Sequence, residues 1–193
     1  MIETYYRLQI HDREGVLVRD SGEVPSHSYV IQFLEMVEGW VNDENKIATD
    51  VDNAETRIAW DTGFDGFSGD INAVAGDDNH GIVVGTNTGP TAEDNLNYKL
   101  DTKILHSAVG AAGKLNYQAM TWVAPRTVGL NIDLDISRTF LNETGGTITI
   151  KEIGIITWGY EDYYHLILRD VVEDEAVDDA ETLTVVYTLR TIV

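Results

Sequence analysis

The 193-residue sequence contains no cysteine, which excludes disulfide bonds and thiolate metal sites. No run of about 18 apolar residues occurs, so we expect no membrane-spanning helix. Basic residues are scarce, with 13 Lys and Arg against 33 Asp and Glu and a formal net charge of −20. Because phosphate binding needs cationic side chains, this balance argues against nucleic acid or an anionic membrane as a direct partner.

Recognised catalytic motifs are missing as well. The sequence has no P-loop, no dinucleotide-binding glycine fingerprint, no Gly-x-Ser-x-Gly elbow and no His-Glu-x-x-His zinc motif. The five histidines lack the spacing of a ligand pair; they are His11, His27, His80, His106 and His165. These absences predict a protein that is not an enzyme and binds no cofactor. A glycan-cleaving enzyme stays open as an alternative, because it needs only two facing carboxylates.

The second half of the chain alternates between apolar and polar residues. Residues 128–141 and 147–156 alternate on either side of a turn that contains Gly145, and this pattern predicts a β-hairpin. Further strand patterns follow one another with turn residues and no helix between them; they cover residues 81–85, 98–104, 115–123, 164–171 and 182–193. We therefore expect residues 1–193 to form a single all-β domain, an antiparallel, jelly-roll-like β-sandwich.

The predicted hairpin places two charged residues inside apolar faces. Arg138 has the same parity as Ile136 and Phe140, and Glu152 lies among isoleucines on the return strand. Folding the chain at Gly145 brings Glu152 opposite or diagonal to Arg138. Because an unpaired buried charge costs several kcal/mol, we predict a structural ion pair between Arg138 and Glu152. A catalytic glutamate held by an arginine is the functional alternative, although no nucleophile or base accompanies the two in sequence.

Residues 1–41 are expected to form a strand pair followed by the one convincing helix. The helix pattern covers residues 28–41, with Ser26 or Ser28 as the N-cap. Apolar residues recur along it every three or four positions, which makes it amphipathic and usually indicates packing on a core. The second interpretation is a contact with a neighbouring subunit, made by Phe33, Val37 and Trp40.

Residues 42–80 are rich in Asp, Asn and Gly, and we expect a long loop excursion with little regular structure. Asp61, Asp65 and Asp70 within it could surround a calcium ion, but their spacing does not match an EF-hand, and Asp-Gly segments are usually plain turns. We therefore predict no metal and keep calcium as the alternative. Five aromatic residues could stack on sugars, with core or loop packing as the other interpretation; they are Trp60, Trp122, Trp158, Tyr160 and Tyr163.

Three blocks of the sequence together form a recognisable pattern. The first block is Gly81-Ile-Val-Val-Gly-Thr86 with Pro90, Thr91, Asp94 and Leu96 after it. The second runs from Ile136-Ser-Arg-Thr-Phe140 through Asn142 and Thr144–Ile150 to Lys151-Glu-Ile-Gly-Ile155. The third is Leu166-Ile-Leu-Arg-Asp-Val171 followed by residues 182–190. Together the three blocks resemble a family of β-sandwich structural proteins from the virions of tailed bacteriophages. The helix after Ser26 also fits the N-terminal part of such proteins, so the resemblance covers most of the chain outside residues 42–78.

The resemblance implies a non-enzymatic structural subunit of a phage-like virion, as a capsid decoration or tail-associated protein. Such a subunit is assembled in the host cytoplasm, in several copies, through symmetric contacts with itself and with other virion proteins. No catalytic residue carries over; Arg138, Glu152 and Arg169 match the pattern as framework positions. The strong acidity departs from the family. A carbohydrate- or receptor-binding module of a virion tip is the alternative function.

Overall fold

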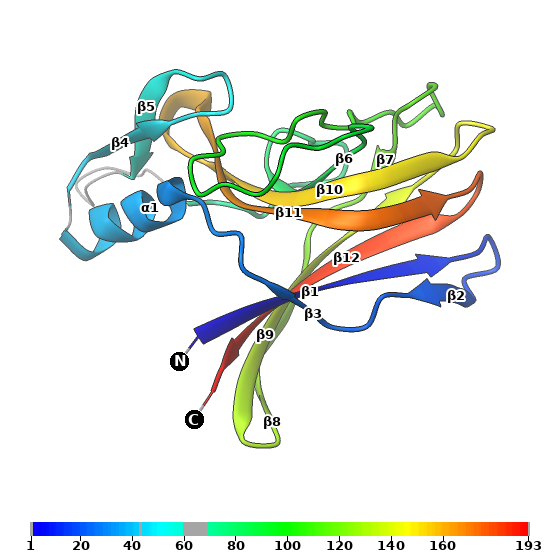
Figure 1. Cartoon of the computed structure of the whole chain (residues 1–193), viewed down its shortest axis with the longest axis horizontal. Helices are drawn as coiled ribbons and strands as arrows, with labels where there is room; N and C mark the ends of the chain where they lie inside the picture. The colour runs from blue at the N-terminus through cyan, green and yellow to red at the C-terminus, as the bar shows by residue number, and fades with distance from the viewer. Residues whose placement is uncertain (1, 43, 60–68, 193) are drawn as a thin grey trace.

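The computed structural model describes residues 2–42, 44–59 and 69–192. The fold is built mainly from antiparallel β-strands, and the described residues contain one α-helix (Figure 1). The expectation of an all-β, antiparallel fold is therefore confirmed. The strands form one seven-stranded sheet, one three-stranded sheet and one two-stranded sheet.

The seven-stranded sheet contains both ends of the chain. Its hydrogen-bonded order is β2-β1-β12-β9-β7, with β3 paired to β1 and β8 paired to β9. The strands are β1 (Ile2–His11), β2 (Leu17–Asp20), β3 (Val24–Ser26), β7 (Asn116–Tyr117), β8 (Thr121–Val128), β9 (Asn131–Leu141) and β12 (Thr182–Thr191). Alternation along the long strands gives this sheet one apolar and one polar face, as the period of two requires.

The three-stranded sheet is more deeply buried, and its order is β11-β10-β6. Its strands are β6 (Gly81–Gly85), β10 (Ile148–Trp158) and β11 (Tyr164–Val177), and the turn of 3₁₀-helix η1 (Tyr160–Asp162) joins the last two. All five residues of β6 are buried, as is the run from Glu152 to Thr157 in β10. A strand buried on both faces is a continuous apolar run, which explains why these segments do not alternate cleanly.

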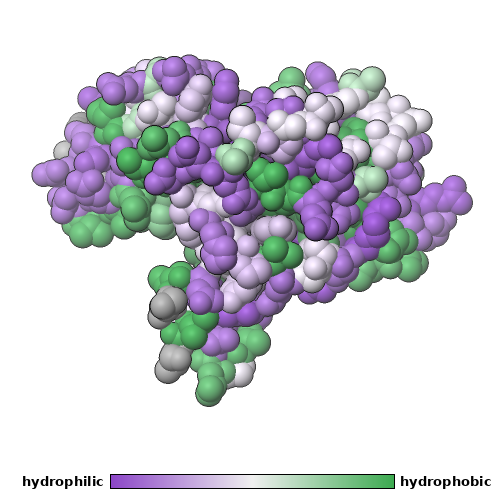
Figure 2. Space-filling model, in the orientation of Figure 1, coloured by the Kyte–Doolittle hydropathy of each residue, from purple (hydrophilic) through white to green (hydrophobic). Residues whose placement is uncertain are grey.

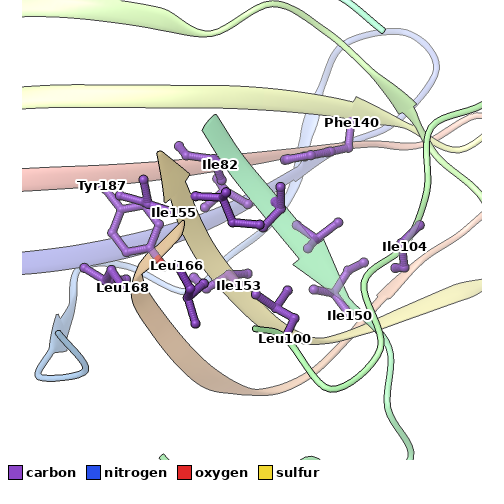
Figure 3. Packing of buried hydrophobic residues seen from close by; sticks show 14 of the residues in the cluster. Ile82, Leu100, Ile104, Phe140, Ile150, Ile153, Ile155, Leu166, Leu168 and Tyr187 are labelled. Atoms are coloured by element: carbon purple, nitrogen blue, oxygen red, sulfur yellow. The ribbon is translucent and has the colours of Figure 1, made fainter. Parts of the chain in front are cut away.

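The two larger sheets share one hydrophobic core. It combines Leu183, Val185 and Tyr187 of β12 with residues of β6, β10 and β11 (Figure 3). Figure 3 shows Ile82, Ile153, Ile155 and Leu166 gathered between the strands, with Phe140 and Tyr187 beside them.

Strands β9 and β10 do not form the predicted hairpin. They are consecutive in sequence and joined by a short turn, but β9 belongs to the seven-stranded sheet and β10 to the three-stranded sheet. Each strand already has partners on both edges: β12 and β7 or β8 flank β9, whereas β11 and β6 flank β10. The turn is fixed by Asn142, whose side-chain nitrogen donates to the carbonyls of Gly146 and Val177 at 2.7 and 2.8 Å.

Helix α1 (Ile31–Asn42) begins three residues after the start of the predicted range and ends one residue beyond it. Residues 28–30 instead extend along the edge of β11, where the amide of Arg169 donates to the Ser28 carbonyl and the amide of Val30 to the Ile167 carbonyl. The side of the helix buried most deeply consists of Gln32, Met36 and Gly39. Much of the predicted apolar stripe is therefore exposed; Leu34 is 65% exposed and Val41 is 78% exposed.

The segment 42–80 is more ordered than expected. It contains strands β4 (Lys46–Thr49) and β5 (Glu55–Ala59), which pair with each other and pack against α1. Asp50 organises the turn between them, because one of its carboxylate oxygens accepts the amides of Asp52 and Ala54 at 3.0 and 2.9 Å. The described residues beyond it, from Ile71 to His80, form turns without a strand, as the composition predicted.

Candidate functional site

Arg138 is completely buried and has backbone carbonyl groups as its partners. Its guanidinium lies 4.8 Å from the centre of the Tyr117 ring. It donates to five carbonyl oxygens, those of Val74, Asp77, His80, Ile82 and Gln118. Four of these belong to residues 74–82, so Arg138 fixes that segment against the seven-stranded sheet. Burial lowers the pKa of the guanidinium.

Glu152 binds a different arginine from the one predicted. It is completely buried, and its Oε2 accepts hydrogen bonds from the Nε and Nη2 of Arg169 at 3.0 and 2.8 Å. The amides of Asp101 and Thr102 also donate to its carboxylate, at 3.0 and 3.3 Å. The predicted Arg138–Glu152 pair is therefore wrong. Its premise was a shared sheet, and the two residues lie in different sheets.

Arg169 holds a second surface segment in place. Besides Glu152 it binds the side chains of Asn97 and Asp101, at 2.9 and 3.3 Å, and the carbonyl of Thr91 at 3.1 Å. The side chain of Arg169 is 1% exposed and that of Glu152 is 0% exposed, so neither can meet a substrate. The two buried arginines are anchors that tie long connections to the sheets.

Two further buried groups titrate abnormally. Asp170 of β11 accepts hydrogen bonds from the hydroxyls of Ser26 and Tyr187 at 3.0 and 2.9 Å, which connects the two larger sheets. Burial raises the pKa of its carboxyl to about 6, although both hydrogen bonds act in the opposite direction. Burial also lowers the pKa of His165 to about 4.

His165 belongs to a chain of polar groups that resembles a catalytic relay. The Thr56 hydroxyl lies 2.9 Å from its Nε2 and 3.3 Å from an oxygen of Asp50. All three residues are buried. A nucleophile must reach its substrate, so this burial favours a structural role, in which the chain ties the β4–β5 hairpin to β11.

The other predicted site residues do not come together. Asp61 and Asp65 lie outside the described residues, while Asp70 accepts the amide of Asn72 at 2.7 Å in a local turn. The part of the chain that the structure describes contains no group of three His, Cys, Asp or Glu able to hold a metal ion. None of its helices is long and apolar enough to span a membrane.

The predicted contact residues of α1 differ in their surroundings. Phe33 is half-buried and packs on Tyr29 with ring centres 4.2 Å apart. Val37 is also half-buried, whereas Trp40 is 48% exposed and lies against Gly69. Their role as a subunit contact stays a prediction.

A more extensive exposed surface lies on the seven-stranded sheet. Figure 1 shows the ends of β1, β8, β9 and β12 projecting away from the rest of the molecule. We call this part the sheet extension; it comprises Ile2–Tyr5, Thr121–Val128, Asn131–Asp135 and Thr188–Thr191. The strand register decides which of its side chains share a face, because directly paired residues point to the same side.

Ion pairs cover the outer face of the sheet extension. Arg190 donates to both oxygens of Asp133, at 2.8 and 2.7 Å, and also binds Glu23 at 3.0 Å. Beside them, Arg126 pairs with Asp135. Two arginines thus bind three carboxylates on this face, which leaves it charged.

The inner face of the sheet extension continues the apolar core face of the sheet, yet it is exposed. Ile132 pairs with Thr191, which pairs with Ile2, so the three share this side. Ile2 is 70% exposed, Ile132 is 48% exposed and Trp122 is 45% exposed. Leu130 at the tip is 87% exposed. Figure 2 shows apolar side chains collected on the projecting part of the molecule.

No charged side chain of the four strands lies on this inner face within the extension. By register, the residues on it are Ile2, Thr4, Trp122, Thr127, Ile132, Leu134, Leu189 and Thr191. Thr4 is buried against Tyr29 and Leu134 and Leu189 are half-buried, so the exposed part consists of Ile2, Trp122, Thr127, Ile132 and Thr191. In a chain whose residues are 24% charged, an exposed uncharged face of this size is the most distinctive surface feature. Alternation of apolar and polar residues in the sequence marks this face as apolar. The alternating pattern is the same, however, whether another segment covers the face or leaves it open to solvent.

Comparison of the chain with protein-family models, with curated proteins and with solved structures found no match.

Proposed function

We propose that this chain is a non-enzymatic structural subunit of a phage-like virion, as a capsid decoration or tail-associated protein. In this proposal the two larger sheets form a jelly-roll-like sandwich that serves as a rigid body, and the subunit acts through contacts with other proteins. It needs no cofactor and meets neither nucleic acid nor a membrane directly, in keeping with its net charge of −20.

The observation that carries the proposal is the exposed inner face of the sheet extension. An isolated soluble protein gains little from leaving a core-like sheet face in water, because each buried Å² of apolar surface is worth about 25 cal/mol. A subunit that is covered by neighbours in an assembly recovers that free energy. The resemblance of the three sequence blocks to virion proteins supplies the kind of assembly.

The buried polar residues support a framework role. Arg138, Glu152 and Arg169, which stand out most in the sequence, are all 1% exposed or less. Their partners are backbone carbonyls and amides, each other's charges, and the side chains of Asn97 and Asp101, so they hold loops in place. This arrangement is what a rigid building block requires.

Mass spectrometry of phage-like particles, produced by the genome that encodes the chain and purified on a density gradient, tests the proposal. We expect the chain in the particle fraction at a fixed stoichiometry to the major capsid or tail proteins. Its absence from intact particles, while the same lysate contains it as a free protein, would contradict the proposal.

A carbohydrate- or receptor-binding role is the second candidate, because of a surface pocket beside the β4–β5 hairpin. The pocket measures about 360 Å³ and combines an aromatic ring, charged groups and polar groups; its lining is Ile47, Glu55, Thr56, Arg57, Glu161 and Tyr163. Tyr163 is 37% exposed, and Glu161 has a left-handed backbone with φ of 54°. Glycan-array binding that is lost in Tyr163→Ala would support this role, and absence of binding by the wild type would remove it.

A further inference from the structure

We infer that the inner face of the sheet extension pairs face to face with the same face of a second copy of this chain. The inference rests on the proposed function, since it names the partner for the surface on which that function depends. The two copies would be related by a two-fold axis, so that each contributes the same residues.

The edges of the sheet extension are unsuited to pairing, which leaves its faces. On one side β8 is the edge strand, and its register shifts between Val123 and Arg126. Pro125 within this bulge has no amide hydrogen to offer a further strand. On the other side β3 covers β1 from Thr4 to Tyr6. Only Ile2 and Glu3 remain uncovered on that edge, and two residues are too few for a further strand to form a stable ladder.

The distribution of charge favours the inner face as the contact surface and a second copy of the chain as the partner. On the outer face Arg126 and Arg190 bind Asp133, Asp135 and Glu23, and Glu3 adds a further carboxylate, so docking there would bury an ion-pair network with excess negative charge. The inner face has no charge to attract a charged partner. For a chain with a net charge of −20, a second copy can approach only where both surfaces are uncharged, and this face meets that condition.

The geometry also fits self-pairing. Apolar faces of antiparallel sheets pack against each other about 10 Å apart with their strands nearly aligned. Four strands at roughly 4.8 Å spacing, with about five residues of each, give a flat face of roughly 300 Å². This area is below the roughly 800 Å² that each partner buries in a standard interface, so the pair should be reversible and strengthened by repetition within an assembly.

Sedimentation velocity of the purified full-length chain over a wide concentration range tests the inference with two matched variants. Ile132→Lys places a charge on the inner face, whereas Val123→Lys places the same charge on the outer face, where Val123 pairs with Asp135. The two residues are 48% and 49% exposed, so each substitution should leave the fold intact, which circular dichroism and the melting temperature check.

We expect a concentration-dependent dimer for the wild type and for Val123→Lys, and self-association on the order of ten-fold weaker or more for Ile132→Lys, because a symmetric pair buries the new charge twice. Dimerisation should tighten as salt rises, since screening reduces repulsion between two acidic chains. A wild type that stays monomeric up to about 1 mM, or equal dimerisation of both variants, would overturn the inference. The particle experiment is independent: a monomeric chain found in particles retains the structural role and loses only the self-pairing.

Discussion

Arg169 reaches across the β10–β11 ladder and donates two hydrogen bonds to a single oxygen of Glu152. The contacts measure 3.0 Å from Nε and 2.8 Å from Nη2. Glu152 is in register with Val171, and Arg169 with Gly154, so the two charges are diagonal neighbours on one face of the sheet. With both side chains buried, each charge depends on its polar partners in place of water, and the other member of the pair is the charged partner nearest to it.

Replacing Glu152 with Gln should destabilise the protein by about 3 kcal/mol, because the buried Arg169 would lose its nearest carboxylate and keep only the longer contact with Asp101. Urea denaturation followed by circular dichroism measures the change. An unchanged midpoint would contradict the assignment of this pair.

A double-mutant cycle separates the observed pair from the one that the sequence suggested. Glu152→Gln combined with Arg169→Met should be strongly non-additive, with a coupling energy of about 1–3 kcal/mol. Glu152→Gln combined with Arg138→Met should be additive within about 0.5 kcal/mol, since the two residues share no partner among the described residues. Stronger coupling of Glu152 to Arg138 than to Arg169 would reverse the conclusion.

Asp170 should reduce stability as the pH rises. Its folded pKa of about 6 lies above the ordinary value of 3.8, so between these values the folded state keeps a proton that the unfolded state releases. The free energy of unfolding therefore falls through this window, by about 3 kcal/mol at most. Asp170→Asn should gain about 1–3 kcal/mol over the wild type at pH 7 and show no gain near pH 4. Urea titrations at both pH values check this, and an equal effect at both would refute it.

His165 should behave in the opposite sense. Its folded pKa of about 4 lies below the ordinary value of 6.5, so the unfolded state binds a proton first and stability is lost as the pH falls through this range. Imidazole resonances in NMR spectra provide the measurement. The His165 signals should stay constant from neutral pH down to about 5.5 and move only near pH 4. A midpoint near 6.5 would show that the ring is solvated.

Two glycines test the packing of the loop before β7. Gly110 and Gly113 both have left-handed backbones, with φ of 66° and 70°. A Cβ on Gly110 would lie 2.0 Å from the carbonyl oxygen of Glu143, whereas one on Gly113 meets nothing within 4 Å. Gly113→Ala should therefore cost about 1 kcal/mol, for backbone conformation alone. Gly110→Ala should cost clearly more, because the loop must also move away from Glu143. Equal melting temperatures for the two variants would contradict this close contact.

Most strands were predictable from the sequence because alternation is a local property. The patterns at 81–85, 164–171 and 182–193 correspond to β6, β11 and β12, and the helix pattern at 28–41 overlaps α1. The need for partners to buried charges also followed from residue type and parity alone. Both predictions depend only on neighbours within one strand or one helix turn.

The pairings were not predictable, and the error at Arg138 shows why. Parity indicates that a side chain faces the core, but it does not identify which sheet covers that core. An arginine can also satisfy its donors with backbone carbonyls, as Arg138 does with residues 74–82, and nothing in the sequence of β9 distinguishes this from an ion pair.

By itself the sequence determined that the chain is acidic, free of cysteine and composed mainly of β-strands with buried arginines. Only the tertiary structure decided that consecutive strands β9 and β10 separate into different sheets, that Glu152 belongs to Arg169, and that the apolar face around Ile132 is open to solvent. The physical reason is that local patterns record which side of a strand is apolar, whereas coverage of that side depends on segments far away in the chain.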